Sequence, residues 1–166
     1  VQARDAFYQA VRGLMNLARW GIDVEIRVVV HALSLPRLPE PAEFVARTFP
    51  FAGHVALMGL EPIGFAKTNW QTLWTDPADP AYQRQLQRAA RTLALHGLEV
   101  SIYNHQLCTL PREIWGIAAR SISDWKNVYL PACDGCVVRE RCGGFFASAL
   151  DGRHSAHVAP FRDVPP

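Results

Sequence analysis

Four cysteines carry the clearest chemical signal in the sequence. Cys133, Cys136 and Cys142 form a Cys-x2-Cys-x5-Cys pattern, and Cys108 precedes Cys133 by 25 residues. A Cys-x2-Cys turn directs both of its sulfurs toward one metal, and thiolates are ligands of zinc and of iron–sulfur clusters. The sequence therefore predicts that these four cysteines bind one metal centre.

The spacing leaves the kind of centre open. A zinc ion held by four thiolates is one alternative, and an iron–sulfur cluster is the other. His154 or His157, near the C-terminus, is an alternative ligand in place of Cys108. Two histidines in a polar tail are more often simply solvated, so the four cysteines remain the preferred ligand set.

The residues beside the last two cysteines suit thiolate chemistry. Arg139 and Arg141 lie between Cys136 and Cys142, and nearby cations favour the thiolate form. The following pair, Gly143-Gly144, carries no side chains, so backbone N–H groups are expected to approach the sulfurs.

Composition places the chain among ordinary globular proteins. Of its 166 residues, 49% are hydrophobic and 19% are charged, which suits one domain with a real core. The net charge is only +2 and the basic residues are scattered, so we expect no nucleic-acid partner. No apolar run approaches the roughly 20 residues of a membrane span. No signal peptide is visible, and we expect a cytoplasmic protein whose thiols stay reduced.

The elements that must position the cysteines alternate between helices and strands. Helical spacing of apolar residues predicts helices over residues 5–20, 41–49 and 81–96, and Pro111 predicts a short helix to about 120. We expect Asp5 to cap the first helix and Gly21 to end it, and either Asp79 or Asp76 to cap the third. Runs rich in β-branched residues predict strands over 24–30, 54–60 and 98–104. This alternation predicts an α/β fold with a parallel sheet, its strands buried on both faces. A turn-rich link over 121–127 leads to the cysteines.

The first strand and the helix before it also indicate a missing neighbour. The strand over 24–30 would present an unpaired apolar edge, and the opening helix has no strand before it to cross over from. We therefore expect further strands N-terminal to Val1, or strands supplied by another chain.

Several residues near the strands are candidates for ligand binding. Glu25 and Arg27 share one face of the first strand, where they pair with each other or meet a ligand. Gly59 and Glu61 follow the second strand, and ligands gather at the carboxyl ends of parallel strands. The alternative is a simple bend at Gly59 and a solvated carboxylate at Glu61. The tryptophans of the connection over 62–77 are expected to cover the core, or the mouth of a barrel if the parallel sheet forms one, rather than stack on a cofactor.

Several segments, taken in order, resemble a known enzyme family. The chain from about residue 5 to 157 resembles the C-terminal half of a radical S-adenosylmethionine (radical SAM) enzyme with a SPASM or twitch extension. It is most similar to the maturase of the His-Xaa-Ser peptide-modification system. The segments that carry the resemblance are residues 24–29, 56–61, 101–105 with 107–108, the Ser-Ile-Ser-Asp-Trp-Lys-Asn link over 121–127, and Cys-Gly-Gly-Phe-Phe-Ala-Ser over 142–148.

The resemblance implies a fold and a reaction. The fold would be the C-terminal half of a (β/α)6 partial TIM barrel, with three βα units over residues 1–107. A cluster-binding extension would follow over 108–150, and then a polar tail over 151–166. The family cleaves S-adenosylmethionine reductively, and the resulting 5′-deoxyadenosyl radical abstracts hydrogen from a substrate peptide.

The resemblance also implies two sets of binding residues. Cys108, Cys133, Cys136 and Cys142 would bind an auxiliary 4Fe-4S cluster. The first strand would border the S-adenosylmethionine site, and the ends of the other two strands would lie near the adenine. The residues expected to bind the cofactor, with Glu61 included from its place after the second strand, are Glu25, Arg27, Met58, Gly59, Glu61, Tyr103 and Asn104.

The sequence departs from the family in one respect. It lacks the Cys-x3-Cys-x2-Cys motif of the cluster that cleaves S-adenosylmethionine, and it lacks the Gly-Gly-Glu strand end that holds the methionyl amine. We therefore expect a fragment or a degenerate copy that generates no radical alone. Its expected partners are a substrate peptide and either the missing barrel half or a partner maturase. The alternative function is a non-catalytic zinc-binding structural module.

Overall fold

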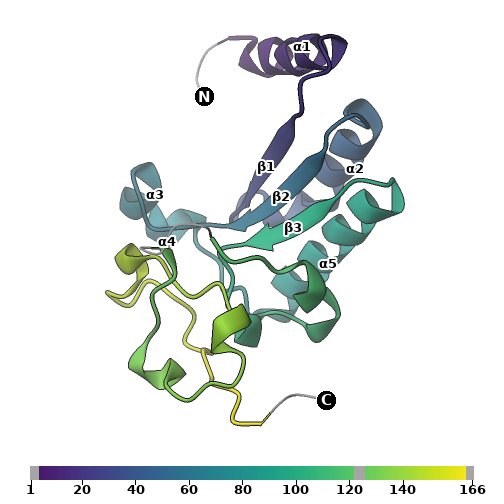
Figure 1. Ribbon diagram of the computed structural model, residues 1–166. Helices are drawn as coiled ribbons and strands as arrows, with labels where there is room; N and C mark the ends of the chain where they lie inside the picture. The colour runs from purple at the N-terminus through teal and green to yellow at the C-terminus, as the bar shows by residue number, and fades with distance from the viewer. Residues whose placement is uncertain (1–3, 122–125, 164–166) are drawn as a thin grey trace.

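A computed structural model of the protein describes residues 4–121 and 126–163 and shows an α/β fold (Figure 1). The sheet has three parallel strands in the order β1-β2-β3, which are Glu25–Val30, His54–Gly59 and Val100–Tyr103. Val55 lies opposite Ile26 on one side and Val100 on the other. The three carboxyl ends therefore meet at one edge of the sheet.

Two helices cover one face of this sheet. They are α2 (Pro39–Thr48) and α5 (Pro80–Leu95), which lie side by side (Figure 1). Asp79 begins α5 as predicted, because its carboxylate accepts a hydrogen bond from the Ala81 N–H at 2.6 Å. The core between the sheet and the helices is aliphatic, with Val55, Leu57, Leu86, Leu93 and Ile102 almost fully buried.

The opposite face of the sheet is exposed along β1, which corrects the prediction that this strand is buried on both faces. On β2 the prediction holds better, because Ala56 lies on the same face and is buried. Burial alternates along β1: Glu25, Arg27 and Val29 are exposed, whereas Val30 is buried. The reason is that α2 and α5 lie on the other side, so every second residue of β1 faces outward.

Helix α1 (Ala6–Arg19) precedes β1 and stands beyond the amino-terminal end of the sheet (Figure 1). It has no buried residue, although Val11, Leu14 and Met15 pack partly against the core. Asp5 was predicted to cap it, but the Asp5 backbone is left-handed and its side chain makes no capping bond. Gly21, at φ 63°, ends the helix as expected.

The connections after β2 and β3 are more structured than the sequence indicated. The segment predicted as an open connection contains two short helices, α3 (Phe65–Thr68) and α4 (Trp70–Leu73). The helix predicted over 111–120 is a 3₁₀ helix at Arg112–Ile117. Within the predicted link over 121–127, residues 122–125 lie outside the described residues.

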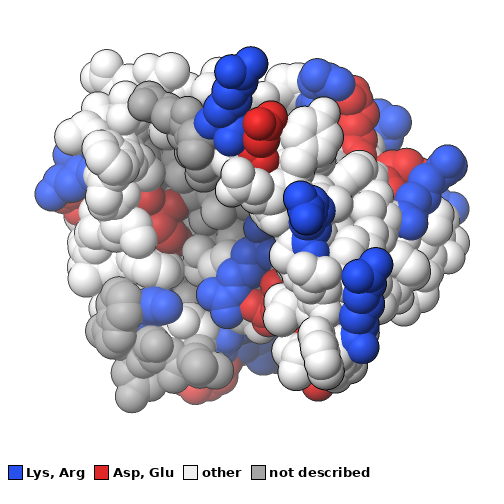
Figure 2. All heavy atoms as spheres, turned by 90° about the horizontal axis from the view of Figure 1, so that it is seen from above, with Lys and Arg blue, Asp and Glu red and all other residues white. Residues whose placement is uncertain are grey.

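The cysteine-rich segment folds from 3₁₀ turns and packs below the carboxyl ends of the strands (Figure 1). One antiparallel bridge joins Val128 to Phe145. Figure 2 shows one face of the molecule, where lysines and arginines are interspersed with acidic residues. None of the helices described is long and apolar enough to cross a membrane.

Candidate metal centre and adjoining pocket

All four cysteines line one cavity, which we call the cysteine cavity. It encloses about 340 Å³, including the open space at its mouth. The rest of its wall is mainly apolar and includes Leu107, Val138, Phe145, Val158, Ala159, Pro160 and Phe161. The structure thus brings Cys108 to the other three cysteines, as the sequence predicted.

Tight turns hold each cysteine. Cys108 lies in the 3₁₀ turn that follows β3, so the last strand of the sheet delivers it to the cavity. Cys133 ends another 3₁₀ turn, and its carbonyl accepts the N–H of Cys136 at 3.1 Å. Cys142 directly follows the 3₁₀ turn Arg139–Arg141. Short turns of this kind fix the backbone and let the sulfurs point inward.

Two side chains fix the segment around Cys142. The Tyr129 hydroxyl lies 2.8 Å from the carbonyl oxygen of Cys142 and 3.1 Å from that of Arg139. The Gln106 amide donates a hydrogen bond to the Gly144 carbonyl at 2.7 Å. Gly144 has a φ of 61°, and a Cβ atom there would lie 2.7 Å from the Val128 carbonyl oxygen. Only glycine fits this position without a backbone shift.

Burial and backbone amides act in opposite directions on the thiols. Burial raises the pKa of Cys108 to about 11 and also raises the pKa of Cys142. Backbone N–H groups lower both pKa values in part: that of Ala159 at Cys108, and those of Gly144 and Leu107 at Cys142. The Gly144 N–H therefore approaches Cys142 as the sequence predicted. Thiolates in such a wall become stable when a metal supplies positive charge.

The donor set fits a thiolate-bound centre. Four thiols, an apolar wall and amide donors aimed at the sulfurs are the features that surround such centres. Among the described residues, no three His, Cys, Asp or Glu side chains converge closely enough to hold a single metal ion. A tetrahedral zinc site brings its sulfurs within about 3.8 Å of one another, whereas an iron–sulfur cluster places each thiolate on a different iron.

The two tail histidines lie elsewhere. The His154 ring packs edge-on against Phe145, and its Nδ1 atom donates to the Ser155 carbonyl at 3.0 Å. His157 pairs with Asp76, with 3.2 Å between Nδ1 and Oδ2. Neither histidine belongs to the wall of the cysteine cavity, whereas Cys108 does. The tail is nonetheless structural, because residues 158–161 form part of that wall.

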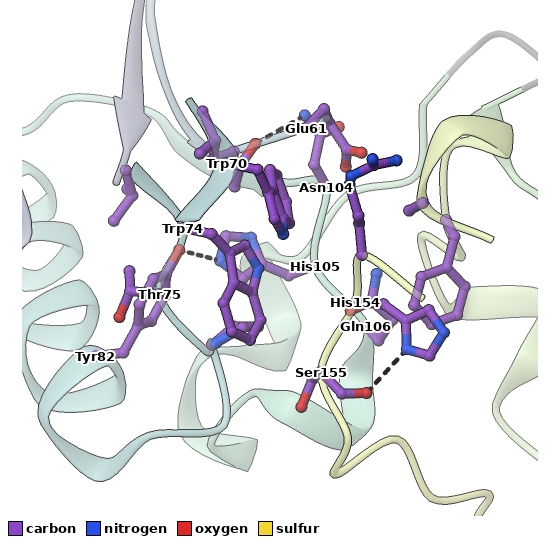
Figure 3. A pocket seen from close by; sticks show the side chains of 17 residues that line it. Glu61, Trp70, Trp74, Thr75, Tyr82, Asn104, His105, Gln106, His154 and Ser155 are labelled. Atoms are coloured by element: carbon purple, nitrogen blue, oxygen red, sulfur yellow. Dashed lines mark hydrogen bonds between the residues drawn. The ribbon is translucent and has the colours of Figure 1, made fainter. Parts of the chain in front are cut away.

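A second cavity, the strand-end pocket, lies at the carboxyl ends of all three strands (Figure 3). Measured in the same way as the cysteine cavity, it encloses about 450 Å³, including the open space at its mouth, and about 40 Å³ of this can be occupied by the centres of water-sized groups. Of the predicted cofactor residues it contains Gly59, Glu61 and Asn104. The backbone of Asn104 has a left-handed conformation, with φ 62°. A Cβ atom at Gly59 would lie 2.6 Å from the carbonyl oxygen of Asn104. The absence of a side chain at Gly59 therefore allows these two strand ends to approach.

The other predicted cofactor residues do not join this pocket. Glu25, Arg27, Met58 and Tyr103 line a groove on the open face of the sheet, and Asn104 borders both places. Side chains alternate along a strand, so positions on the open face cannot also point past its end. The seven residues therefore divide between two sites.

Glu25 and Arg27 pair with each other, which was one of the two expectations for them. The Glu25 carboxylate also lies 2.9 Å from His54 Nδ1, and His54 Nε2 lies 2.9 Å from the Ser101 hydroxyl. Hydrogen bonds from Arg27 and His54 lower the pKa of Glu25. A polar chain thus crosses all three strands on the open face.

The strand-end pocket also contains residues that sequence reasoning did not select. His105 is buried, and its Nδ1–H donates to the Tyr103 carbonyl at 2.8 Å. Its Nε2 atom must then accept the Tyr82 hydroxyl, also at 2.8 Å. Burial lowers the pKa of His105 to about 4, so the ring is neutral. The available signal was its position directly after the third predicted strand.

The two cavities share a wall. Gln106 and Phe145 line both the cysteine cavity and the strand-end pocket. Comparison of the chain with protein-family models, with curated proteins and with solved structures gives no match. The function is therefore argued from the geometry and the sequence motifs.

Proposed function

We propose that the chain binds an auxiliary 4Fe-4S cluster through Cys108, Cys133, Cys136 and Cys142. It would do so as the C-terminal part of a radical SAM peptide-modifying maturase. One observation carries the proposal: Cys108 and the three cysteines of a motif that begins 25 residues later line one cavity beside the carboxyl ends of a parallel sheet. Parallel sheets place ligand sites at that edge.

The chain's own residues support this role. The amides of Ala159 and Gly144 stabilise thiolate charge, and the wall around the partly buried cysteines is mainly apolar. The four cysteines would hold the cluster, which would supply either a binding site for the substrate or one-electron redox chemistry. Gln106 and Phe145 separate that position from the strand-end pocket, so a substrate in the pocket would lie one side-chain layer from the cluster.

The open sheet face supports the proposed barrel. In a closed or partial barrel one sheet face is covered by helices and the other faces the interior. Here α2 and α5 cover one face, and the other carries the Glu25–His54–Ser101 chain. We propose that further strands, from the missing barrel half or a partner maturase, face this side and complete an S-adenosylmethionine site in a cytoplasmic enzyme.

A zinc-binding structural module is the second candidate. Its support is the set of four cysteines in one largely apolar cavity, since structural zinc sites are rich in thiolates. In that case the metal would stabilise the turns of the C-terminal segment, and the chain would need no substrate pocket.

Anaerobic reconstitution with iron and sulfide separates the two candidates. We expect about four iron and four sulfide ions per chain and broad absorbance near roughly 400 nm. Serine variants of each cysteine should lose most of the iron. The His154→Ala and His157→Ala variants are the controls and should keep it. A colourless protein that holds one tightly bound zinc ion, lost in the same cysteine variants, would replace the cluster by the zinc module.

A further inference from the structure

Glu61 brings a carboxyl group into the strand-end pocket without a partner. The residue is half-buried, and the fully buried Pro62 behind it fixes the backbone at the end of β2. Its carboxylate has no hydrogen bond or ion pair within the described residues. A carboxylate in such a place is costly unless a ligand supplies a donor or a positive charge.

Two tryptophans stand beside this carboxyl group. Trp70 begins α4 and Trp74 directly follows its last residue, and their rings stack with centroids 5.8 Å apart. Figure 3 shows both indoles pointing into the pocket, with Glu61 and Asn104 on its far side. Indole rings attract cations through their negative faces. A cation in the pocket would therefore meet both a carboxylate and an aromatic surface.

The other groups around the pocket do not oppose a cation strongly. His105 is neutral, because burial lowers the pKa of its ring to about 4. Arg153 reaches the wall but is paired with Asp151. His154 donates its Nδ1–H to a backbone carbonyl. In the part of the chain that the structure describes, Glu61 is the one charged group of this wall without a counter-charge.

The size of the pocket limits the ligand. The space open to the centres of water-sized groups, about 40 Å³, has room for roughly three or four of them, since one water needs about 10–15 Å³. An ammonium head fits this space. The open side of the pocket then leaves the rest of the ligand outside.

We propose that the strand-end pocket binds the cationic end of a basic side chain of a peptide, as the ammonium of a lysine-type residue. Glu61 is the counter-charge, and Trp70 and Trp74 form the aromatic surface. The proposal rests on the proposed function only in taking the ligand to be a peptide. The recognition itself follows from the pocket.

Titration of the full chain with N-acetyl-lysine amide tests this proposal, followed by tryptophan fluorescence and calorimetry at pH 8.5. N-acetyl-norleucine amide has a similar chain without the ammonium and should bind about tenfold more weakly or not at all. Glu61→Gln should lower the affinity for N-acetyl-lysine amide by a similar factor. Glu99→Gln, an exposed residue outside the pocket, is the matched control and should bind as the wild type does.

The pH dependence adds a second readout. Burial raises the pKa of Glu61 to about 8, so affinity for the lysine probe should rise as the pH passes through 8. The Glu61→Gln variant should show no such rise. Circular dichroism of the variant establishes that it is folded, and its iron content after reconstitution reports the cysteine cavity separately.

Two outcomes would overturn the proposal. Either the two probes bind equally, or Glu61→Gln binds the lysine probe as tightly as the wild type does. A loss of iron binding with intact lysine recognition would instead count against the cluster alone.

Discussion

The side-chain amide of Gln106 donates a hydrogen bond to the carbonyl oxygen of Gly144 at 2.7 Å. This bond joins the chain just after β3 to the glycine pair beside Cys142. Gln106 is only 8% exposed, so water cannot easily replace the donor. The relationship links the sheet to the cysteine cavity and explains why the turn keeps its position.

Replacing Gln106 by leucine removes this donor and leaves a buried carbonyl without a partner. We expect a loss of about 1–3 kcal/mol in the free energy of unfolding, measured by urea denaturation. The control is Gln87→Leu, because the Gln87 amide makes a weak exposed bond to Glu113 at 3.4 Å. Equal losses in the two variants would contradict the role of Gln106.

Gly144 and Gly152 form a matched pair for testing the turn after Cys142. Both have positive φ, at 61° and 93°, so alanine costs roughly 1–2 kcal/mol of backbone strain in each. Only at Gly144 would the new Cβ atom meet a backbone oxygen, whereas open space surrounds Gly152. Gly144→Ala should therefore lower the melting temperature further than Gly152→Ala, and it alone should reduce iron binding. Equal iron contents in the two variants would show that the cysteine turn tolerates the shift.

Local patterns in the sequence were sufficient to predict the main helices and strands and the meeting of the four cysteines. β-Branched runs and helical spacing identified β1, β2, β3, α2 and α5, and Asp79 marked the beginning of α5. A Cys-x2-Cys turn is itself local, and Cys108 follows a strand directly. The meeting of the four cysteines at one cavity could be expected because a strand end and a turn each have few possible directions.

Tertiary surroundings decided what the sequence could not show. An apolar run such as 28–30 does not reveal whether both faces of its strand are covered, and the structure leaves one face open. Because side chains alternate along a strand, Glu25 and Met58 lie in the groove on the open face, whereas Glu61 lies in the strand-end pocket. The pairing of His105 with Tyr82 joins residues 23 positions apart, on a loop and a helix, and no local pattern predicts such a contact.

The Tyr82 hydroxyl supports the strand-end pocket through His105. Tyr82→Phe leaves the Nε2 atom of His105 buried without a donor, and we expect unfolding to become easier by about 1–3 kcal/mol. Tyr8→Phe is the control, since Tyr8 is 68% exposed.

The neutral His105 ring adds a pH dependence. Because burial lowers the pKa of His105 to about 4, the contribution of His105 to the free energy of unfolding is complete above pH 6.5 and is lost as the pH falls toward 4. Denaturant unfolding at pH 7 and 5 measures both effects, and an unchanged Tyr82→Phe variant would mean that the hydroxyl is not the donor.

Glu61 should give the protein the opposite pH dependence in the absence of a ligand. Its pKa is raised to about 8 in the folded chain by burial, above the ordinary value near 4.5 that the unfolded chain retains. The folded state therefore holds a proton that the unfolded state has lost. The contribution of Glu61 to the free energy of unfolding is complete below pH 4.5. It decreases as the pH rises toward 8, by at most about 1.4 kcal/mol per pH unit.

The Glu61→Gln variant tests this prediction, because the glutamine does not titrate. The difference in unfolding free energy between variant and wild type should grow from pH 5 to pH 8 and then stay constant. Glu99→Gln, on the exposed surface, should show no such trend. A constant difference for Glu61→Gln across this range would mean that the carboxylate is solvated. In that case the strand-end pocket would have no uncompensated charge to offer a cation.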